Sequence, residues 1–179
     1  MKNITITKLE KNDFGQLFKL MQASFPPAEY RKKEKQYAIL DDENYSVSVF
    51  KDNGKICAFL ASWLVNDFIF IEHLAVSPDM RGAGVGSAFM KEYLNKSTLP
   101  VVLEVEDLKT DIAKRRIDFY QRLGFVLSEV RYRQPNFDNS DVVIPLRIMY
   151  FGNISTEKLS TVKQNIFKNI YKQNGEKYE

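Results

Sequence analysis

The sequence predicts an α/β (α+β) protein with a mixed, mainly antiparallel central sheet of about seven strands and helices on both faces. Apolar residues recur at a helical period in some segments and at a period of two in others. The turn signal Asp52-Asn53-Gly54 separates two of three successive strands, which predicts antiparallel neighbours. A strand, a glycine-rich loop, a helix and another strand follow over 68–106, which predicts one parallel pair.

The predicted elements follow the order β-α-α-β-β-β-α-β-α-β-β-α. The first helix is expected to begin after Asn12 or Asp13, whose side chains suit an N-cap, and to end at Pro26. A second, charged helix is expected over 29–40. We expect strands at 4–9, 45–49, 56–65, 68–76, 101–106, 125–132 and 142–151, and later helices at 87–95, 111–123 and 155–171.

Composition narrows the functional classes. The 179 residues are 44% hydrophobic and 27% charged, typical of one globular domain, and the net charge is only +3. Basic and acidic residues are interspersed, so we expect no nucleic-acid partner. With one Cys57 and one His73, metal-ligand spacings are missing and we expect no metal. The lack of a signal-peptide core or a membrane-length apolar run favours a cytoplasmic protein without a membrane partner.

The most informative segment follows the strand that ends at Val76. There Arg81-Gly82-Ala83-Gly84-Val85-Gly86 opens a helix. The glycines allow backbone amides to approach a ligand, and the helix N-terminus adds unpaired N–H groups and a positive dipole end. Arg81 adds a guanidinium. Together these features predict a phosphate site. A Walker A loop and a dinucleotide fingerprint both require other spacings, and a plain helix-capping turn needs only one left-handed glycine.

This segment resembles the GNAT superfamily of acyl-CoA-dependent N-acyltransferases, whose pyrophosphate loop reads Gln/Arg-x-x-Gly-x-Gly/Ala. The blocks Leu74 to Pro78 and Phe119 to Phe125 are similar to the family's flanking blocks. The motifs cover about 68–126, and the element order matches over about 1–151. The resemblance implies a GNAT N-acetyltransferase domain at 1–151, with 152–179 as a C-terminal amphipathic helical extension of the same domain.

The resemblance also implies acetyl-CoA as cosubstrate, with its thioester between the diverging strands 68–76 and 101–106. A backbone N–H near the end of the first strand would polarise the thioester carbonyl. Ala113 departs from the family, because many relatives carry there an asparagine that contacts the coenzyme. The expected coenzyme-binding residues are Leu74, Ala75, Val76, Arg81, Gly82, Ala83, Gly84, Val85, Gly86 and Ser87.

Tyr120 is the candidate general acid, since it matches a family tyrosine that often faces the coenzyme sulfur. A phenol stays protonated at neutral pH and can donate a proton to a leaving thiolate. The alternative is a core tyrosine on the buried stripe that also contains Ile117 and Phe119.

Glu72 and Glu104 are the candidate bases or amine-binding carboxylates, because each interrupts an apolar strand, where a carboxylate is costly unless it faces water or a ligand. The alternative for Glu72 is an outward charge paired with a lysine. Glu106 is a weaker candidate on the same face as Glu104. His73 is expected to point away from Glu72 and to be a satisfied histidine under a helix.

The acceptor is predicted to be a primary amine of a small molecule or peptide, attacking the thioester directly in a ternary complex. The segments 24–31 and 131–141 should set its specificity, and an arginine at this lip favours a substrate with a carboxylate. A noncatalytic acyl-CoA-binding sensor and a longer-chain acyltransferase are the alternatives. The protein is expected to be a monomer or homodimer. The expected substrate-binding residues are Phe25, Tyr30, Arg31, Tyr132 and Arg133.

Overall fold

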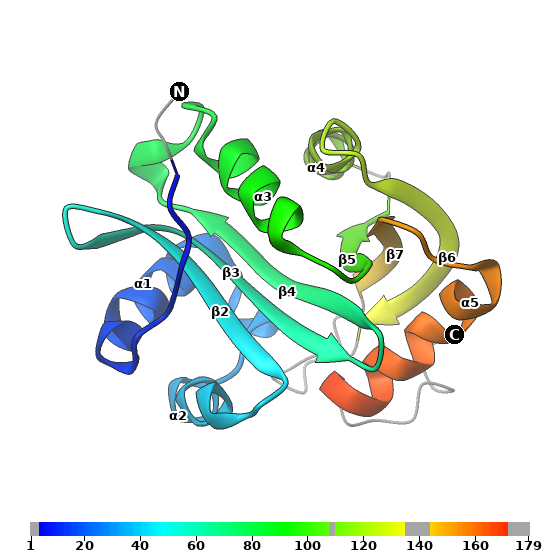
Figure 1. The fold of residues 1–179 in the computed structure, drawn as a ribbon, viewed down its shortest axis with the longest axis horizontal. Helices are drawn as coiled ribbons and strands as arrows, with labels where there is room; N and C mark the ends of the chain where they lie inside the picture. Colours follow the sequence, from blue (N-terminus) through cyan, green and yellow to red (C-terminus); the bar gives the residue numbers. More distant parts are fainter. Residues whose placement is uncertain (1–3, 108–109, 135–143, 172–179) are drawn as a thin grey trace. The chain divides into compact units, whose positions relative to one another are not determined.

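The computed structural model describes residues 4–107, 110–134 and 144–171. Over these residues the strands form a seven-stranded sheet in the order β1-β2-β3-β4-β5-β7-β6, which confirms the mixed, mainly antiparallel sheet (Figure 1). The strands are β1 (Thr7–Lys8), β2 (Tyr45–Asp52), β3 (Lys55–Val65), β4 (Phe68–Val76), β5 (Val101–Glu106), β6 (Val126–Gln134) and β7 (Ile144–Phe151). The α-helices are α1 (Phe14–Ser24), α2 (Lys33–Ala38), α3 (Val85–Lys96), α4 (Asp111–Gln121) and α5 (Thr156–Ile166).

The chain divides into two compact units. The first comprises Met1–Trp63 and Glu72–Ser97, and the second comprises Leu64–Ile71 and Thr98–Glu179. Each unit supplies a different part of the predicted machinery. The glycine-rich loop and Glu72 belong to the first unit, whereas Tyr120 and Glu104 belong to the second.

In the first unit, β2 and β3 form the predicted hairpin, with Tyr45 opposite Trp63 at its open end and Asp52 opposite Lys55 at its turn. The apolar stripe of α1 is buried, as its helical spacing predicts. The first unit also contains α3, and one face of this helix is buried. The fully buried side chains of this unit include Leu17, Met21, Phe59, Leu60, Phe89 and Met90.

In the second unit, β5 lies between a parallel and an antiparallel neighbour. Ile69 to Ile71 of β4 pair with Val101 to Leu103 of β5, so the predicted parallel pair is confirmed. On its other edge β5 pairs antiparallel with β7 along its whole length, from Val101 opposite Phe151 to Glu106 opposite Leu146. The apolar side of α5 is buried as well, through Val162 and Ile166.

Several elements differ from their predicted extents. β1 is only two residues long, and α2 is a short helix flanked by 3₁₀ turns at 27–29 and 39–41. Asp13 is the N-cap residue of α1, but its side chain caps no amide; it forms an ion pair with Lys51 instead. The segment predicted as one helix over 155–171 ends in a π-helical turn, Phe167–Tyr171. Residues 142–143 of the predicted last strand, and 135–141 of the predicted specificity loop, lie outside the described residues.

Candidate functional site

The glycine-rich loop has the conformation that an anion site needs. Gly82 and Gly84 have φ values of +78° and +76°, in the left-handed region that a side chain disfavours by about 1–2 kcal/mol per residue. Gly84 is the N-cap residue of α3 and no side chain caps this end. The first intrahelical bond runs from Ala88 N to Gly84 O, 3.0 Å. Because a helix leaves its first amides without intrahelical acceptors, those of 85–87 are available to a ligand.

Arg81 is anchored beside this loop. Its Nε donates to the carbonyl oxygen of Val76, the last residue of β4, at 3.1 Å. The residue is exposed, and among the described residues it forms no ion pair with an acidic side chain. The guanidinium therefore adds positive charge at the mouth of the α3 N-terminus, where the helix dipole already favours an anion.

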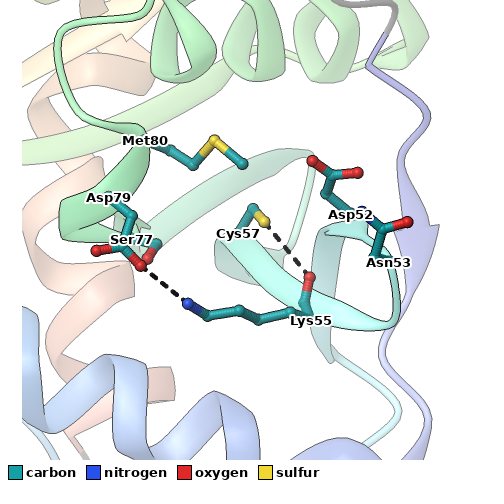
Figure 2. A pocket seen from close by; sticks show the side chains of 7 residues that line it. All are labelled: Asp52, Asn53, Lys55, Cys57, Ser77, Asp79 and Met80. Carbon is teal, nitrogen blue, oxygen red and sulfur yellow. Dashed lines mark hydrogen bonds and ion pairs between the residues drawn. The ribbon is translucent and has the colours of Figure 1, made fainter.

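A hollow of about 330 Å³ lies on the first unit beside the short turn that precedes Arg81. Figure 2 shows Lys55 crossing it to an ion pair with Asp79, 2.9 Å, while the Sγ of Cys57 lies 3.5 Å from the Lys55 carbonyl oxygen. Cys57 is buried, which fits a small apolar core residue. The hollow is lined by Asp52, Asn53, Lys55, Cys57, Ser77, Asp79 and Met80.

Glu72 is part of a buried ion pair. Its side chain is 4% exposed, and its Oε1 lies 2.8 Å from Nη1 of Arg31, whose side chain is 11% exposed. Glu72 therefore does not face bulk water, and its cationic neighbour is an arginine from the segment between α1 and α2 rather than a lysine. Because Glu72 compensates its charge, Arg31 is less available to a substrate carboxylate, and its role in substrate binding stays a prediction.

The ion pair weakens Glu72 as a base. Burial, the largest single effect, would by itself raise the pKa of Glu72, but the combined effects of Arg31 and His73 outweigh it and the pKa is about 2. Relative to an ordinary glutamate, a carboxylate with this pKa accepts a proton less favourably by about 3 kcal/mol. The role of Glu72 as a general base stays a prediction. The ion pair with Arg31 disfavours direct removal of a proton from the amine by Glu72 more than any other form of this role.

Other polar and aromatic residues surround this pair, and the sequence analysis missed them. The Arg31 guanidinium lies 5.6 Å from the ring centre of Trp63, and Trp63 packs on Tyr45 with ring centres 4.7 Å apart. Tyr45 accepts a hydrogen bond from Gln36, at 2.9 Å. Burial, followed by the charge of Glu72, raises the pKa of Tyr45 well above its usual value, so the phenol stays protonated. The polar cluster combines α2 with three strands, which no local pattern in the sequence reveals.

His73 is a buried histidine with a defined partner. Its Nε2 lies 2.8 Å from the carbonyl oxygen of Glu29, so this nitrogen carries the proton that is donated. Its ring packs edge-to-face on Phe25, with centres 4.8 Å apart. Its Nδ1 lies 3.6 Å from Oε2 of Glu72, so the expectation that the two side chains point apart is not met at their polar ends. Tyr30, the remaining predicted substrate residue of this segment, packs on the ring of Phe18.

In the second unit, Tyr120 lies in the buried face of α4. It is 8% exposed and packs between the rings of Phe119 and Phe125. Burial raises the pKa of Tyr120 to about 12, with a small opposing effect of Arg116. The phenol is therefore protonated throughout the physiological range, as a general acid must be before it acts. Both predicted descriptions, acid and core tyrosine, are compatible with this position.

The residues that follow Tyr120 end the helical segment of α4. Gly124 has φ +91° and ends the helical segment, and the amide of Phe125 donates to the Tyr120 carbonyl at 3.1 Å. A Cβ at Gly124 would lie 3.3 Å from the ring of Phe151. At the other end of α4, the amide of Ala113 donates to Oγ1 of Thr110, the N-cap residue, at 3.0 Å.

Glu104 is partly exposed and held by two tyrosines. Tyr132 donates to its Oε1, and Tyr171 donates to its Oε2 at 2.8 Å. Tyr132, which was predicted to bind substrate, therefore forms a hydrogen bond with Glu104, which was predicted to act as a base or to bind the amine. Glu106 forms an ion pair with Arg116 at 3.4 Å, and Arg133 is exposed on β6. Tyr171 was missed because the helical spacing of 155–171 placed other residues on the buried stripe.

The register places both glutamates just beyond the parallel pairing. The pairs of β4 with β5 end at Ile71 and Leu103, although β4 continues to Val76 and β5 to Glu106. Glu72 and Glu104 are the next residues of their strands.

Neither a metal-binding cluster nor a membrane-spanning helix occurs in the described ranges. No group of three or more histidine, cysteine, aspartate or glutamate side chains is placed to hold a metal ion among residues 4–107, 110–134 and 144–171. Within the same ranges, no helix combines the length and the apolar character needed to cross a membrane.

Comparisons with known proteins agree on one family. A family model described as "Acetyltransferase (GNAT) domain" matches residues 43–127. The Bacillus subtilis protein YjbC, named as an acetyltransferase, is 30% identical over 159 residues, covering 86% of this chain and 80% of YjbC. A solved GNAT-family acetyltransferase from Bacteroides thetaiotaomicron is 31% identical, covers 94% of this chain and 98% of its own, and superposes with a TM-score of 0.86.

A further solved structure is the ribosomal-protein-S18-alanine N-acetyltransferase of Escherichia coli. It is 25% identical, covers 86% of this chain and 97% of its own, and has a TM-score of 0.64. The glycine-rich loop, the strand order and these likenesses support one conclusion. The chain belongs to the GNAT family of acetyltransferases.

Proposed function

We propose that the protein transfers the acetyl group of acetyl-CoA to a primary amine of a small molecule or peptide, by direct attack within a ternary complex. The observation that carries the proposal is the conformation of the 81–87 segment. Two left-handed glycines and an uncapped helix N-terminus present backbone N–H groups, and Arg81 adds a positive charge beside them. These donors suit a pyrophosphate, which carries negative charge and many acceptor oxygens.

In this proposal the loop holds the coenzyme so that the thioester lies along the end of β4. Leu74, Ala75 and Val76 precede the loop on β4, and a backbone N–H of this stretch polarises the thioester carbonyl. Such a donor stabilises the oxyanion that forms when the amine attacks. No side chain is needed for this step.

Tyr120 is the proposed general acid. Its pKa of about 12 keeps the phenol protonated at neutral pH. Complete proton transfer to the departing thiolate is unfavourable, because a thiol with a pKa near 8.5 is the stronger acid, but the phenol can donate a hydrogen bond to the negative charge that develops on sulfur. The expected contribution is therefore stabilisation of the thiolate through a hydrogen bond, with the proton coming from the amine by way of solvent or Tyr120.

Two acceptor classes remain in the proposal. The relative from Escherichia coli is named for acting on the alanine of a ribosomal protein, which supports a peptide N-terminus, and a free small amine has the same reacting group. Glu72 and Glu104 are the proposed carboxylates that take the amine proton or bind the ammonium form.

The decisive experiment is titration calorimetry of the wild-type protein with coenzyme A and acetyl-CoA, beside the variant Arg81→Ala. We expect micromolar binding of both ligands and a loss of about tenfold in the variant, the size of one charge-assisted contact to phosphate. Absence of heat with folded wild-type protein would refute the proposal. Release of free thiol from acetyl-CoA with a panel of amines then separates an enzyme from a protein that only binds the coenzyme.

A further inference from the structure

The hollow on the first unit contains a thiol that the proposed transfer reaction does not use. Cys57, near the start of β3, lines this hollow, and Figure 2 shows its side chain among the other lining residues. The residue is 2% exposed, so a molecule reaches its Sγ only by entering the hollow. Because the sequence contains one cysteine, a disulfide at Cys57 would need a sulfur from another molecule.

A buried hydroxyl in the same hollow has no partner. Ser77 directly follows β4, lines the hollow and is 5% exposed. Its amide donates to the carbonyl oxygen of Cys57 at 2.8 Å, and its carbonyl oxygen accepts from the amide of Met80 at 2.9 Å. Its side-chain hydroxyl, by contrast, takes part in no hydrogen bond among the described residues. Since a buried hydroxyl without a partner is unfavourable, this group indicates an occupant that bonds to it.

The ion pair that crosses the hollow can open at little cost. Nζ of Lys55 lies 2.9 Å from Oδ2 of Asp79, and the two side chains are 65% and 73% exposed. An ion pair this exposed contributes about 0–1 kcal/mol, so the flexible Lys55 side chain can move aside. The volume of about 330 Å³ lies at the lower end of the range of about 300–1,000 Å³ found for small-molecule sites. The hollow therefore has room for a small group beside Cys57.

Lys55 also gives the thiol a cationic neighbour. The hydrogen bond and the charge of Asp79, and to a smaller extent the charge of Cys57, raise the pKa of Lys55. Lys55 therefore carries its positive charge at neutral pH. A nearby ammonium group favours the thiolate, which is the reactive form of cysteine. Asp79 competes with the thiolate for this ammonium group, because both lie beside Lys55.

We infer that Cys57 is a modification site at which a low-molecular-weight disulfide exchanges with the thiol, and that the hollow restricts the attached group to a small one. The Cys57 thiolate attacks one sulfur of the disulfide, and a new S–S bond forms as the original S–S bond breaks. The departing sulfur leaves with the bonding electron pair and takes a proton from water. Cys57 is oxidised and the departing sulfur is reduced. The inference does not depend on the proposed function.

The first test measures whether the folded hollow selects for size. Rate constants for bis(2-hydroxyethyl) disulfide and for the much larger glutathione disulfide are measured by intact-protein mass spectrometry, on folded protein and on protein unfolded in urea. Dividing the folded rate constant by the unfolded one removes the intrinsic reactivity of each reagent. We expect this ratio to be at least about tenfold higher for the small disulfide. Cys57→Ser is the control and should gain no mass.

The second test uses the ion pair and the small, uncharged disulfide. Asp79→Asn leaves the ammonium group of Lys55 to the thiolate and should raise the rate constant about threefold. Lys55→Met keeps most of the stem, removes the charge and should lower the rate constant about threefold. Asp41→Asn is the matched control, because it breaks an exposed ion pair with Lys11 away from the lining of the hollow. It should react like wild type.

Three results would overturn the inference. The first is folded wild type that forms no adduct with the small disulfide. The second is an equal ratio for the two disulfides, which would mean that Cys57 reacts only when the protein unfolds. The third is a change of the same sign in Asp79→Asn and Lys55→Met, which would show that loss of the ion pair, and not the charge beside the thiol, controls the reaction.

Discussion

The buried pair of Glu72 and Arg31 makes a sharp prediction about stability. Arg31→Met removes the positive charge and keeps most of the apolar stem, so Glu72 is left buried at 4% exposure without its counter-ion. The pKa of Glu72 is about 2 in the folded protein against an ordinary 4.5. At ~1.4 kcal/mol for each pKa unit, the native environment of this carboxylate contributes about 3 kcal/mol at pH 7. We expect Arg31→Met to lower the free energy of unfolding by about that amount.

The sign of the pH dependence distinguishes this mechanism from lost packing. A depressed pKa contributes stability above pH 4.5 that is lost as the pH falls toward 2. In Arg31→Met burial, the largest single effect, is opposed only by His73, so the pKa of Glu72 rises and the folded variant binds a proton more readily than the folded wild type. The stability gap between wild type and variant should therefore narrow as the pH is lowered from 7 to 4.

Urea unfolding followed by far-ultraviolet circular dichroism measures the difference in free energy of unfolding between wild type and Arg31→Met. The loss of stability expected for the variant corresponds to a fall in Tm of about 6–12 °C. Adding Glu72→Gln to Arg31→Met should recover part of the loss, since it removes the uncompensated charge. Asp79→Asn, which breaks an exposed ion pair with Lys55, is the control and should leave the midpoint unchanged. An Arg31→Met midpoint equal to wild type at pH 7, or a gap that is constant with pH, would refute the reasoning.

Three further predictions concern the glycine-rich loop and Tyr120. Gly84→Ala should weaken the binding of coenzyme A, measured by calorimetry, about tenfold, because a Cβ disfavours the φ of +76° that orients the first amides of α3. The control is Gly54→Ala, which has the same φ in the hairpin turn; it should destabilise the fold without changing the affinity for coenzyme A. Tyr120→Phe should reduce kcat at least tenfold in a free-thiol assay while the KM for acetyl-CoA stays within about twofold, and equal activity would exclude Tyr120 as the acid. Because the pKa of Tyr120 is about 12, its deprotonation should cause no fall in kcat/KM of the coenzyme-free enzyme between pH 7 and 10; a titration in that range that disappears in Tyr120→Phe would contradict its burial.

The elements with strong local signals were predictable. Period-two alternation and the Asn53-Gly54 turn predict the β2–β3 hairpin, and β5 has the predicted bounds of 101–106. Elements that depend on packing were less accurate. α2 is shorter than expected because its charged sequence buries little of the helix, and Asp13 pairs with Lys51, 38 residues away, instead of capping α1.

By itself the sequence determined the order of the elements, the mixed sheet and the glycine-rich loop before α3, because these depend on side-chain period and on glycines close together in the chain. Only the tertiary structure decided the state of the two glutamates. Glu72 meets Arg31 from 41 residues earlier, and Glu104 meets Tyr171 from 67 residues later. A carboxylate's charge state and orientation depend on neighbours in space, and burial between distant segments supplies neighbours that no local pattern records.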